Sequence, residues 1–262
     1  MRSFVDAVQP NPGRMFDYWL GGHHNFLVDR LLGKAIAVIE PSTPLQVRMV
    51  RWFLKFAIQQ LVAQGFDQFL DFASGLPAVD HIHETAPPGT RVLYSDLDQV
   101  VVAHGQRVVG AYPHVRMVQA DCRRPEELLA APAVQELFGA GRRVAIVFNG
   151  IAPYLEPAEM RHTMRVLYGW AADGSCLALS VPVQVTPEPL PVALKFVEMY
   201  NKRMDSPFNV WSLATTQELL LPWRPNEQGC RPATAWLDVA DPAVTETETR
   251  TGWVLYGAFL VK

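Results

Sequence analysis

Beyond Gly65 the sequence alternates short apolar runs with longer segments of helical periodicity. This order is typical of βαβ units, in which successive parallel strands are joined by helices that pack on the sheet. Because such crossovers are right-handed, the helices would cover both faces of one mostly parallel sheet. The alternation therefore predicts an α/β fold of the Rossmann-like kind.

The predicted elements can be placed by residue number. Five apolar runs are predicted as strands: 69–72, 92–94, 115–118, 144–148 and 176–181. The predicted helices are 78–86, 98–110, 125–138 and 157–172, followed beyond a proline-rich stretch by 192–204 and 214–221. Two final strands, 233–239 and 250–261, would pair as an antiparallel hairpin at the edge of the sheet.

The segment before the sheet, residues 11–65, reads as helical. Gly65 suits the end of its last helix, because glycine readily adopts the left-handed conformation that follows many helices. We therefore divide the chain into an N-terminal helical lid or cap, residues 1–65, and a Rossmann-like domain, residues 66–262.

Polar residues follow the first two predicted strands. The first strand runs into Asp71, and the small residues Ser74 and Gly75 come shortly after it. In open α/β sheets, ligands bind beyond the carboxyl ends of the strands, where small residues let the backbone approach closely. A tight turn with a solvated carboxylate would explain the same residues without a ligand. At the second strand end, Asp96 could accept both ribose hydroxyls of a nucleotide, whereas Asp98 could simply cap the next helix.

The third and fourth predicted strands end in the same way. Asp121 and Cys122 follow the third strand, where a carboxylate could accept the exocyclic amine of adenine or merely cap a turn. Asn149 follows the fourth strand and could bond to a cofactor or to a substrate. Because these strand ends would meet at one edge of the sheet, the polar side chains would converge on a single crevice.

The composition argues against several classes of protein. The formal net charge is −3 and basic residues occur in short pairs, so binding to nucleic acid is not expected. No apolar run is long enough to span a bilayer, and the first residues lack the apolar core of a signal peptide. The three isolated cysteines indicate neither a disulfide framework nor a zinc site. We therefore expect a cytoplasmic protein without a metal site or a membrane partner.

The segment from Pro10 to Arg30 reads PNPGRMFDYWLGGHHNFLVDR. It resembles the pattern PNPARxYDYxLGGKDNFxxDR of the actinobacterial S-adenosylmethionine-dependent methyltransferase family, formerly a domain of unknown function. The turn after the first strand, DFASGLPA, is similar to the DxGTGLPT of the same family. The resemblance covers roughly residues 9–170 and is most specific in the N-terminal segment.

This resemblance implies a class I methyltransferase fold, with a seven-stranded sheet whose last strand is antiparallel, and S-adenosylmethionine (SAM) as the cofactor. It implies that the N-terminal helices form a lid that carries Arg14, Asp17, Tyr18 and Asn25. Together with the strand ends, it gives a set of expected cofactor-binding residues: Arg14, Asn25, Asp71, Ser74, Gly75, Asp96, Asp121, Cys122 and Asn149.

The chain departs from the family pattern in the lid, where His23 and His24 replace a lysine–aspartate pair. A lid histidine above the methyl group could take a proton from an acceptor, so these two residues and Tyr18 are the predicted catalytic residues. The histidines could equally be surface residues. Tyr154 is predicted to shape the acceptor pocket, although ordinary packing would also explain it.

Three functions fit these features. The principal prediction is a SAM-dependent methyltransferase that acts on a small-molecule acceptor of secondary metabolism, with a homodimer as a further expectation. The altered lid would also suit an enzyme that uses SAM without methyl transfer, by intramolecular displacement and release of methylthioadenosine. A turn with fewer glycines than the family pattern would suit a non-catalytic SAM-binding protein.

Overall fold

The computed structural model describes residues 8–76 and 80–262. The strands are β1 (Gln68–Asp71), β2 (Arg91–Asp96), β3 (Val115–Gln119), β4 (Ala145–Asn149), β5 (Cys176–Gln184), β6 (Trp211–Ser212), β7 (Arg224–Pro225), β8 (Arg231–Pro232) and β9 (Trp253–Val261). The helices are α1 (Pro12–Trp19), α2 (Leu27–Ile39), α3 (Thr43–Ala63), α4 (Ile82–Thr85), α5 (Gln99–Val109), α6 (Pro125–Leu129), α7 (Pro132–Phe138), α8 (Pro157–Trp170), α9 (Pro191–Asn201), α10 (Leu213–Leu219), α11 (Ala233–Leu237) and α12 (Pro242–Thr251), and a 3₁₀ turn, η1, covers Ala152–Tyr154.

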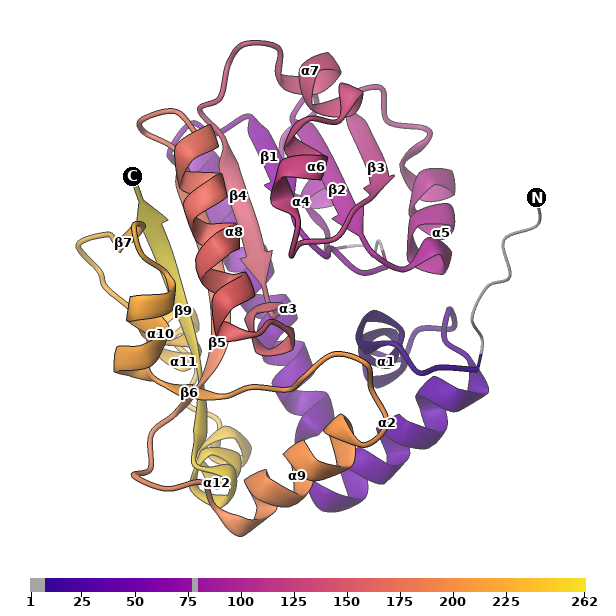
Figure 1. Ribbon diagram of the computed structural model, residues 1–262, viewed down its shortest axis with the longest axis vertical. Coiled ribbons are helices and arrows are strands. Elements are labelled where there is room, and N and C mark those ends of the chain that lie inside the picture. The colour runs from indigo at the N-terminus through magenta and orange to yellow at the C-terminus, as the bar shows by residue number, and fades with distance from the viewer. Residues whose placement is uncertain (1–7, 77–79) are drawn as a thin grey trace.

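The strands form one mixed sheet in the order β3-β2-β1-β4-β5-β9-β7 (Figure 1). Strands β1 to β5 pair in parallel, and β9 runs antiparallel to β5. The two-residue strands β6 and β8 add to β5 and β9 beside this order. The predicted α/β fold, with seven strands along the sheet and an antiparallel last strand, is therefore confirmed.

Helices cover both faces of the sheet. Successive strand residues point to opposite sides, so each strand contributes to two cores. In β4, Ile146 and Phe148 belong to the core beneath α6, α7 and α8. Ala145 and Val147 belong to the core beneath α3 and α5. Figure 1 shows α8 in front of the sheet and α3 behind it. Both faces are buried, as the continuous apolar strand sequences require.

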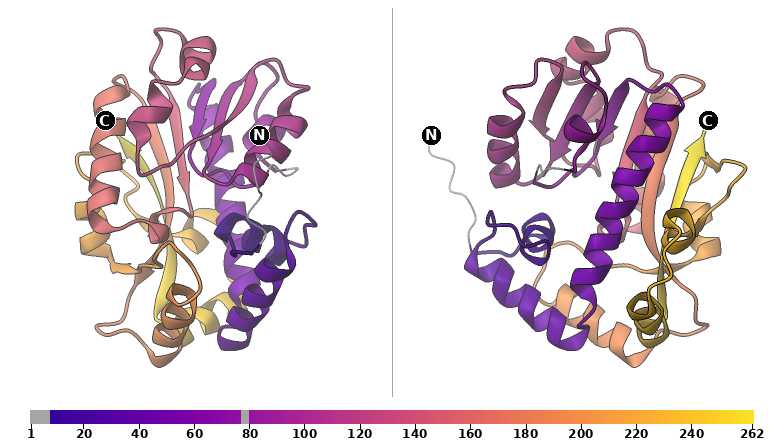
Figure 2. Two further views of the ribbon diagram at one scale, coloured as in Figure 1. Left: turned by 45° about the vertical axis from the view of Figure 1, so that its right-hand side comes forward. Right: turned by 180° about the vertical axis from the view of Figure 1, so that it is seen from behind.

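The N-terminal segment, predicted to be helical over residues 11–65, forms the three helices α1, α2 and α3. The longest, α3, packs on the sheet, where Phe53 lies against Phe259 of β9 with ring centroids 6.1 Å apart. It ends before Gly65, whose φ of +78° is the left-handed conformation predicted for that position. Helices α1 and α2 lie beyond the carboxyl ends of β1 and β2 (Figures 1 and 2). The division of the chain at residue 65 into a lid and a sheet domain stays a prediction.

The predicted C-terminal hairpin is wrong. Its first strand is instead the helix α11, anchored by Trp236, whose Nε1 donates to the Gly257 carbonyl at 2.9 Å. A further helix, α12, occupies the residues before β9. Strand β9 pairs with β5 over nine residues, from Cys176 opposite Val261 to Gln184 opposite Trp253. A short apolar run does not by itself distinguish a strand from a buried helical turn.

Two predicted helices also differ in detail. The segment 125–138 is split into α6 and α7, because Pro132 cannot continue a helix and begins a new one at its first turn. The segment 78–86 contains α4, but its first two residues lie outside the described residues. No helix in the ranges 8–76 and 80–262 is both long and apolar enough to cross a membrane.

Candidate active site

A cavity of about 640 Å³ lies between α1, α3 and the carboxyl ends of β1 to β4. The strand order reverses between β1 and β4, which is where open α/β sheets bind ligands. The volume is typical of small-molecule sites. Nine of the predicted site residues line it: Arg14, Asp71, Ser74, Gly75, Asp96, Asp121, Cys122, Asn149 and Tyr154. The strand-end residues therefore converge as predicted.

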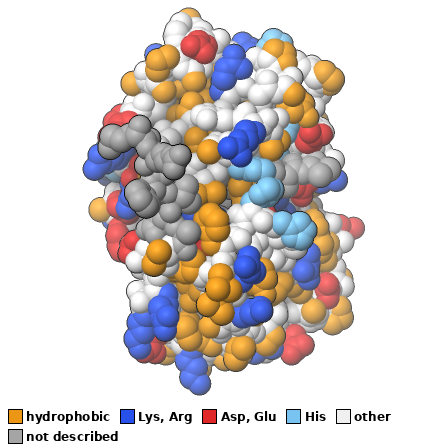
Figure 3. Space-filling view, turned by 90° about the vertical axis from the view of Figure 1, so that its right-hand side faces the viewer, with side chains coloured by type: hydrophobic (Ala, Val, Ile, Leu, Met, Phe, Trp, Pro, Cys, Tyr) orange, Lys and Arg blue, Asp and Glu red, His pale blue; other side chains and the backbone are white. Residues whose placement is uncertain are grey.

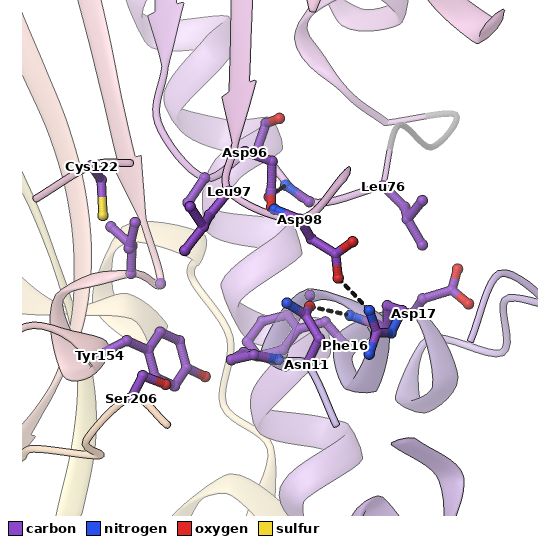
Figure 4. A pocket seen from close by; sticks show the side chains of 18 of the residues that line it. Asn11, Phe16, Asp17, Leu76, Asp96, Leu97, Asp98, Cys122, Tyr154 and Ser206 are labelled. Carbon is purple, nitrogen blue, oxygen red and sulfur yellow. Dashed lines mark hydrogen bonds and ion pairs between the residues drawn. The ribbon is translucent and has the colours of Figure 1, made fainter. Parts of the chain in front are cut away.

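Asp96 ends β2 and faces this cavity (Figure 4). Its carboxylate accepts the Gly75 backbone N–H at 3.0 Å and the Asp98 backbone N–H at 2.9 Å. Burial outweighs these hydrogen bonds and raises the pKa of Asp96 to about 6. Gly75 adopts a φ of +68°, which glycine reaches without strain. The β1 turn and the β2 carboxylate thus form one cradle.

Asp71, at the end of β1, is 3% exposed. Among the described residues, no group donates a hydrogen bond to its carboxylate. Burial raises the pKa of Asp71 well above its usual range, and the charge of Arg51 on α3 partly offsets that effect. Arg51 lines the same cavity, forms an ion pair with Asp80 and donates to Nε2 of His81 at 2.5 Å. The carboxyl group of Asp71 and the guanidinium of Arg51 therefore line the same cavity.

Asp121 and Cys122 line the cavity beyond β3. The carboxylate of Asp121 is already held by Arg123, whose Nε and Nη2 donate at 2.8 and 2.7 Å. Although burial acts to raise it, these hydrogen bonds lower the pKa of Asp121. Burial raises the pKa of the Cys122 thiol to about 12, so that thiol stays neutral.

Asn149 lies at the end of β4 and connects three elements. Its Nδ2 donates to the Val50 carbonyl of α3 at 3.2 Å, and its Oδ1 accepts from the Ser180 hydroxyl at 2.6 Å. The next residue, Gly150, has a φ of +70°, and a Cβ atom there would lie 3.0 Å from Val50. Asn149 therefore positions α3 against the strand ends as well as lining the cavity.

Arg14 fastens α1 to the rest of the site. This buried guanidinium donates from Nε to Asp29 of α2 at 2.9 Å, and it pairs with Asp98 at the start of α5 (Figure 4). The Asn11 backbone N–H donates to the same Asp29 at 2.9 Å. Asp98 also caps α5 by accepting the Val100 N–H at 2.7 Å. The predicted cap is confirmed, and the carboxylate holds the N-terminal helices as well.

Asp17 organises the loop between α1 and α2. Its carboxylate accepts the His24 backbone N–H at 2.8 Å and Nδ2 of Asn25 at 2.7 Å. A Cβ atom on Gly22 would lie 2.0 Å from Oδ1 of Asp17, so only glycine fits beside it. Asn25 is buried in this loop and is not among the residues that line the cavity. Hydrogen bonds to Asp17, near the end of α1, thus hold the loop of residues 20–26 that connects α1 to α2.

The predicted catalytic residues Tyr18, His23 and His24 do not line the cavity. The ring of Tyr18 lies against Gly33 of α2, where a Cβ atom would be 3.0 Å from its Cδ1. His23 and His24 are exposed, and the His24 ring stacks on His104 of α5 with centroids 3.8 Å apart. Figure 3 shows histidine side chains gathered on this outer face. The structure therefore places the histidines on the surface, and their catalytic role stays a prediction.

Tyr154 of η1 lines the cavity on the side away from Asp96 (Figure 4). Its ring stacks on Tyr200 of α9 with centroids 5.9 Å apart, and burial raises its pKa. No hydrogen-bond partner of its hydroxyl lies among the described residues. Sequence analysis did not single out Arg51, because it is one of several polar residues on one stripe of α3.

The whole chain, residues 1–262, matches the model of a family described as S-adenosyl methyltransferase. The protein belongs to this family. It is therefore a SAM-dependent methyltransferase, and SAM is its cofactor. Both conclusions agree with the resemblance found in the N-terminal segment.

Two solved structures are similar to this methyltransferase over nearly its full length. A proposed methyltransferase from Thermobifida fusca YX is 26% identical with a TM-score of 0.87, covering 98% of this chain and 97% of its own. A DUF574 family protein from Streptomyces avermitilis MA-4680 is 26% identical with a TM-score of 0.85, covering 98% and 99%. No curated protein sequence matches the chain.

A more distant structure shares the fold alone. The magnesium protoporphyrin IX methyltransferase from Synechocystis PCC 6803, solved with bound S-adenosylhomocysteine, is 12% identical with a TM-score of 0.53. It covers 95% of this chain and 93% of its own. In the present chain, the residues that line the cavity fit SAM, because the buried carboxylate of Asp96 ends β2 next to the glycine turn at Gly75.

Proposed function

We propose that this methyltransferase transfers the methyl group of SAM to a small-molecule acceptor of secondary metabolism. The observation that carries the proposal is the cradle of Asp96 and Gly75 at the β1 and β2 ends, inside a cavity of about 640 Å³. A carboxylate at that position suits the ribose hydroxyls of a nucleoside. The remaining volume, on the Tyr154 side, supports an acceptor beside the cofactor.

Three regions of the cavity would hold different parts of SAM. Asp96 would accept the ribose hydroxyls, and adenine would lie beside Asp121 and Cys122 beyond β3. The ammonium group of the cofactor would lie beside Asp71, whose buried carboxyl has no hydrogen-bond donor among the described residues and would ionise next to a cation. The carboxylate of the cofactor would lie near Arg51, which also pairs with Asp80. Asp71 and Arg51 thus match a zwitterionic amino-acid group.

Bound SAM would supply an electrophilic methyl group, and Asp96, Asp71 and Arg51 would hold its nucleoside and amino-acid parts. What the chain contributes is alignment and exclusion of water. Helix α1 covers the cavity and is held there by the Arg14–Asp98 pair. The Tyr154 hydroxyl could orient the acceptor by a hydrogen bond. In the described residues, no cluster of histidine, cysteine or acidic side chains could hold a metal ion.

The nucleoside product tests this function. The purified protein is incubated with SAM, alone and with a panel of small amines, phenols and alcohols, and the nucleosides are separated by chromatography. We expect S-adenosylhomocysteine that forms only when an acceptor is present. Methylthioadenosine formed from SAM alone would overturn methyl transfer in favour of intramolecular displacement. Binding of SAM without turnover across the panel would favour a non-catalytic protein.

A cytoplasmic location and a homodimer also stay proposals. Fractionation of cells that express the chain, followed by light scattering of the purified protein, tests the two together. A protein in the membrane fraction or a monomer at micromolar concentration would contradict the respective expectation.

A further inference from the structure

A second cavity, of about 90 Å³, lies beside the first between α1, α3, α9 and α12. Seven aromatic side chains from distant parts of the sequence contribute to its lining: Phe16, Trp19, Tyr154, Phe196, Tyr200, Phe208 and Trp253. The rings contact one another, as Phe196 and Trp253 do at a centroid distance of 5.5 Å. This ring-lined space is shaped for a compact apolar group.

The two cavities meet at four shared residues: Phe16, Val50, Gly150 and Tyr154. Gly150 and Tyr154 follow β4, which is next to the switch point of the sheet. The two cavities are therefore adjacent, and Tyr154 lies between them as part of both linings. Helix α12, which lines the second cavity, lies at the end of the molecule opposite α7 (Figure 1).

Glu248 of α12 is the one charged residue in the lining of the second cavity within the described part of the chain. Among the described residues its carboxylate has no hydrogen bond or ion pair, and partial burial raises its pKa. The nearest cation along α12, Arg250, is occupied by Glu40 and Glu246. An unpartnered carboxylate beside aromatic faces repels anions and attracts cations.

We propose that the second cavity receives the acceptor of the methyltransferase, and that this acceptor is a compact apolar amine. The amine would be protonated and would lie near Glu248, where both the carboxylate and the ring faces favour a positive charge. Its apolar body, of about one ring or less, would fill the aromatic lining. A second, neutral nucleophilic group at its other end, such as a hydroxyl, would lie past Tyr154 and accept the methyl group, losing its proton to solvent. The proposal rests on the function proposed above, because it needs SAM in the first cavity.

Binding of matched probes to the protein saturated with S-adenosylhomocysteine tests the inference. The probes are phenethylamine, 2-phenylethanol and 3-phenylpropanoate, which share a ring and differ in charge. Titration calorimetry gives the affinities. A change in tryptophan fluorescence that is lost in Trp253→Phe would report occupancy of the cavity, because Trp253 lines it. We expect phenethylamine to bind at least about tenfold more tightly than 3-phenylpropanoate.

Two glutamates on the same helix give a matched pair of variants. Glu248→Gln should abolish the preference for the amine while leaving the affinity for S-adenosylhomocysteine unchanged. Glu246→Gln, which changes an exposed residue outside the lining, should keep the preference. Equal affinity of the wild type for all three probes, or a preference that survives in Glu248→Gln, would overturn the inference. Failure to bind S-adenosylhomocysteine would instead contradict the proposed function, so the two failures are distinguishable.

Discussion

Replacing Asp96 by asparagine should weaken cofactor binding and remove its pH dependence. The carboxylate is buried, accepts two backbone N–H groups and has a pKa of about 6. Asparagine has nearly the same shape but carries no charge and offers one acceptor oxygen in place of two. The substitution therefore removes the charge-assisted part of the proposed ribose contact with little change in packing.

The loss of affinity and its pH dependence can both be estimated. A hydrogen bond to a charged group contributes about 1.5–3 kcal/mol, so affinity for S-adenosylhomocysteine should fall by roughly 10- to 150-fold at pH 7.5. In the wild type, ribose binding needs the ionised carboxylate. With a pKa of about 6, roughly one Asp96 in ten is ionised at pH 5, so affinity at that pH should be roughly tenfold weaker.

The assay is titration calorimetry with S-adenosylhomocysteine at pH 7.5, 6 and 5. Asp67→Asn is the control, because that exposed carboxylate precedes β1 at the opposite edge of the sheet and does not line the cavity. Wild-type affinity in Asp96→Asn would refute the ribose assignment. A tenfold loss at pH 5 that persists in Asp96→Asn would show that another carboxyl group, with Asp71 the first candidate, titrates instead.

Further predictions concern the N-terminal helices and the stability of the fold. Gly22→Ala should lower the free energy of unfolding by about 1–3 kcal/mol, because the new Cβ displaces Asp17 from its hydrogen bonds. Gly169→Ala, in the last turn of α8 where a Cβ meets open space, should not destabilise the protein, and thermal melting distinguishes the two variants. Cofactor should slow hydrogen exchange in α1 and α2, and Arg14→Gln should abolish that protection; equal exchange with and without ligand would refute a lid. The surface position of His24 predicts that His24→Gln changes turnover less than about twofold, and a loss near 10²-fold would restore the catalytic role. The pKa of Asp96 is higher in the folded state than its unfolded value of 3.8. Its contribution to the free energy of unfolding is therefore fully present below about pH 4 and is lost as the pH rises to about 6. Urea unfolding of wild type and Asp96→Asn should show that the difference between their free energies of unfolding changes by up to about 3 kcal/mol across this window.

Local sequence signals predicted β1 to β5 well because each of these strands is a short apolar run bounded by turn residues, whereas the two-residue strands β6, β7 and β8 carry no such signal. The same signals placed Asp71, Asp96 and Asn149 at strand ends, and parallel geometry then required them to meet. Residues 233–239 carried no such signal, since Trp236 suits a strand and a buried helical turn equally well. Its packing on β9, which decides the matter, is a long-range contact that no local pattern contains.

The site was predicted where it depends on strand ends and missed where it depends on packing between distant segments. Arg51 enters the cavity because α3 lies across the sheet, a fact that the polar stripe of α3 does not reveal. The second cavity draws Phe16, Phe208 and Trp253 from three regions, and each looks like an ordinary core residue in sequence. His23 and His24 drew attention because they depart from the family pattern. The Asp17 loop places them on the surface, and their catalytic role stays a prediction.

The position of β9 has a consequence for synthesis of the protein in the cell. This strand lies between β5 and β7 in the sheet, yet it follows every other strand along the chain. At ribosomal speeds of about 5–20 residues per second, the 77 residues from Gln184 to Val261 take roughly 4–15 s to make. Throughout that time the apolar edge of β5 has no antiparallel partner and invites intermolecular pairing. A nascent chain cut short before Trp253 would therefore be a substrate for chaperones and proteases rather than a shortened enzyme.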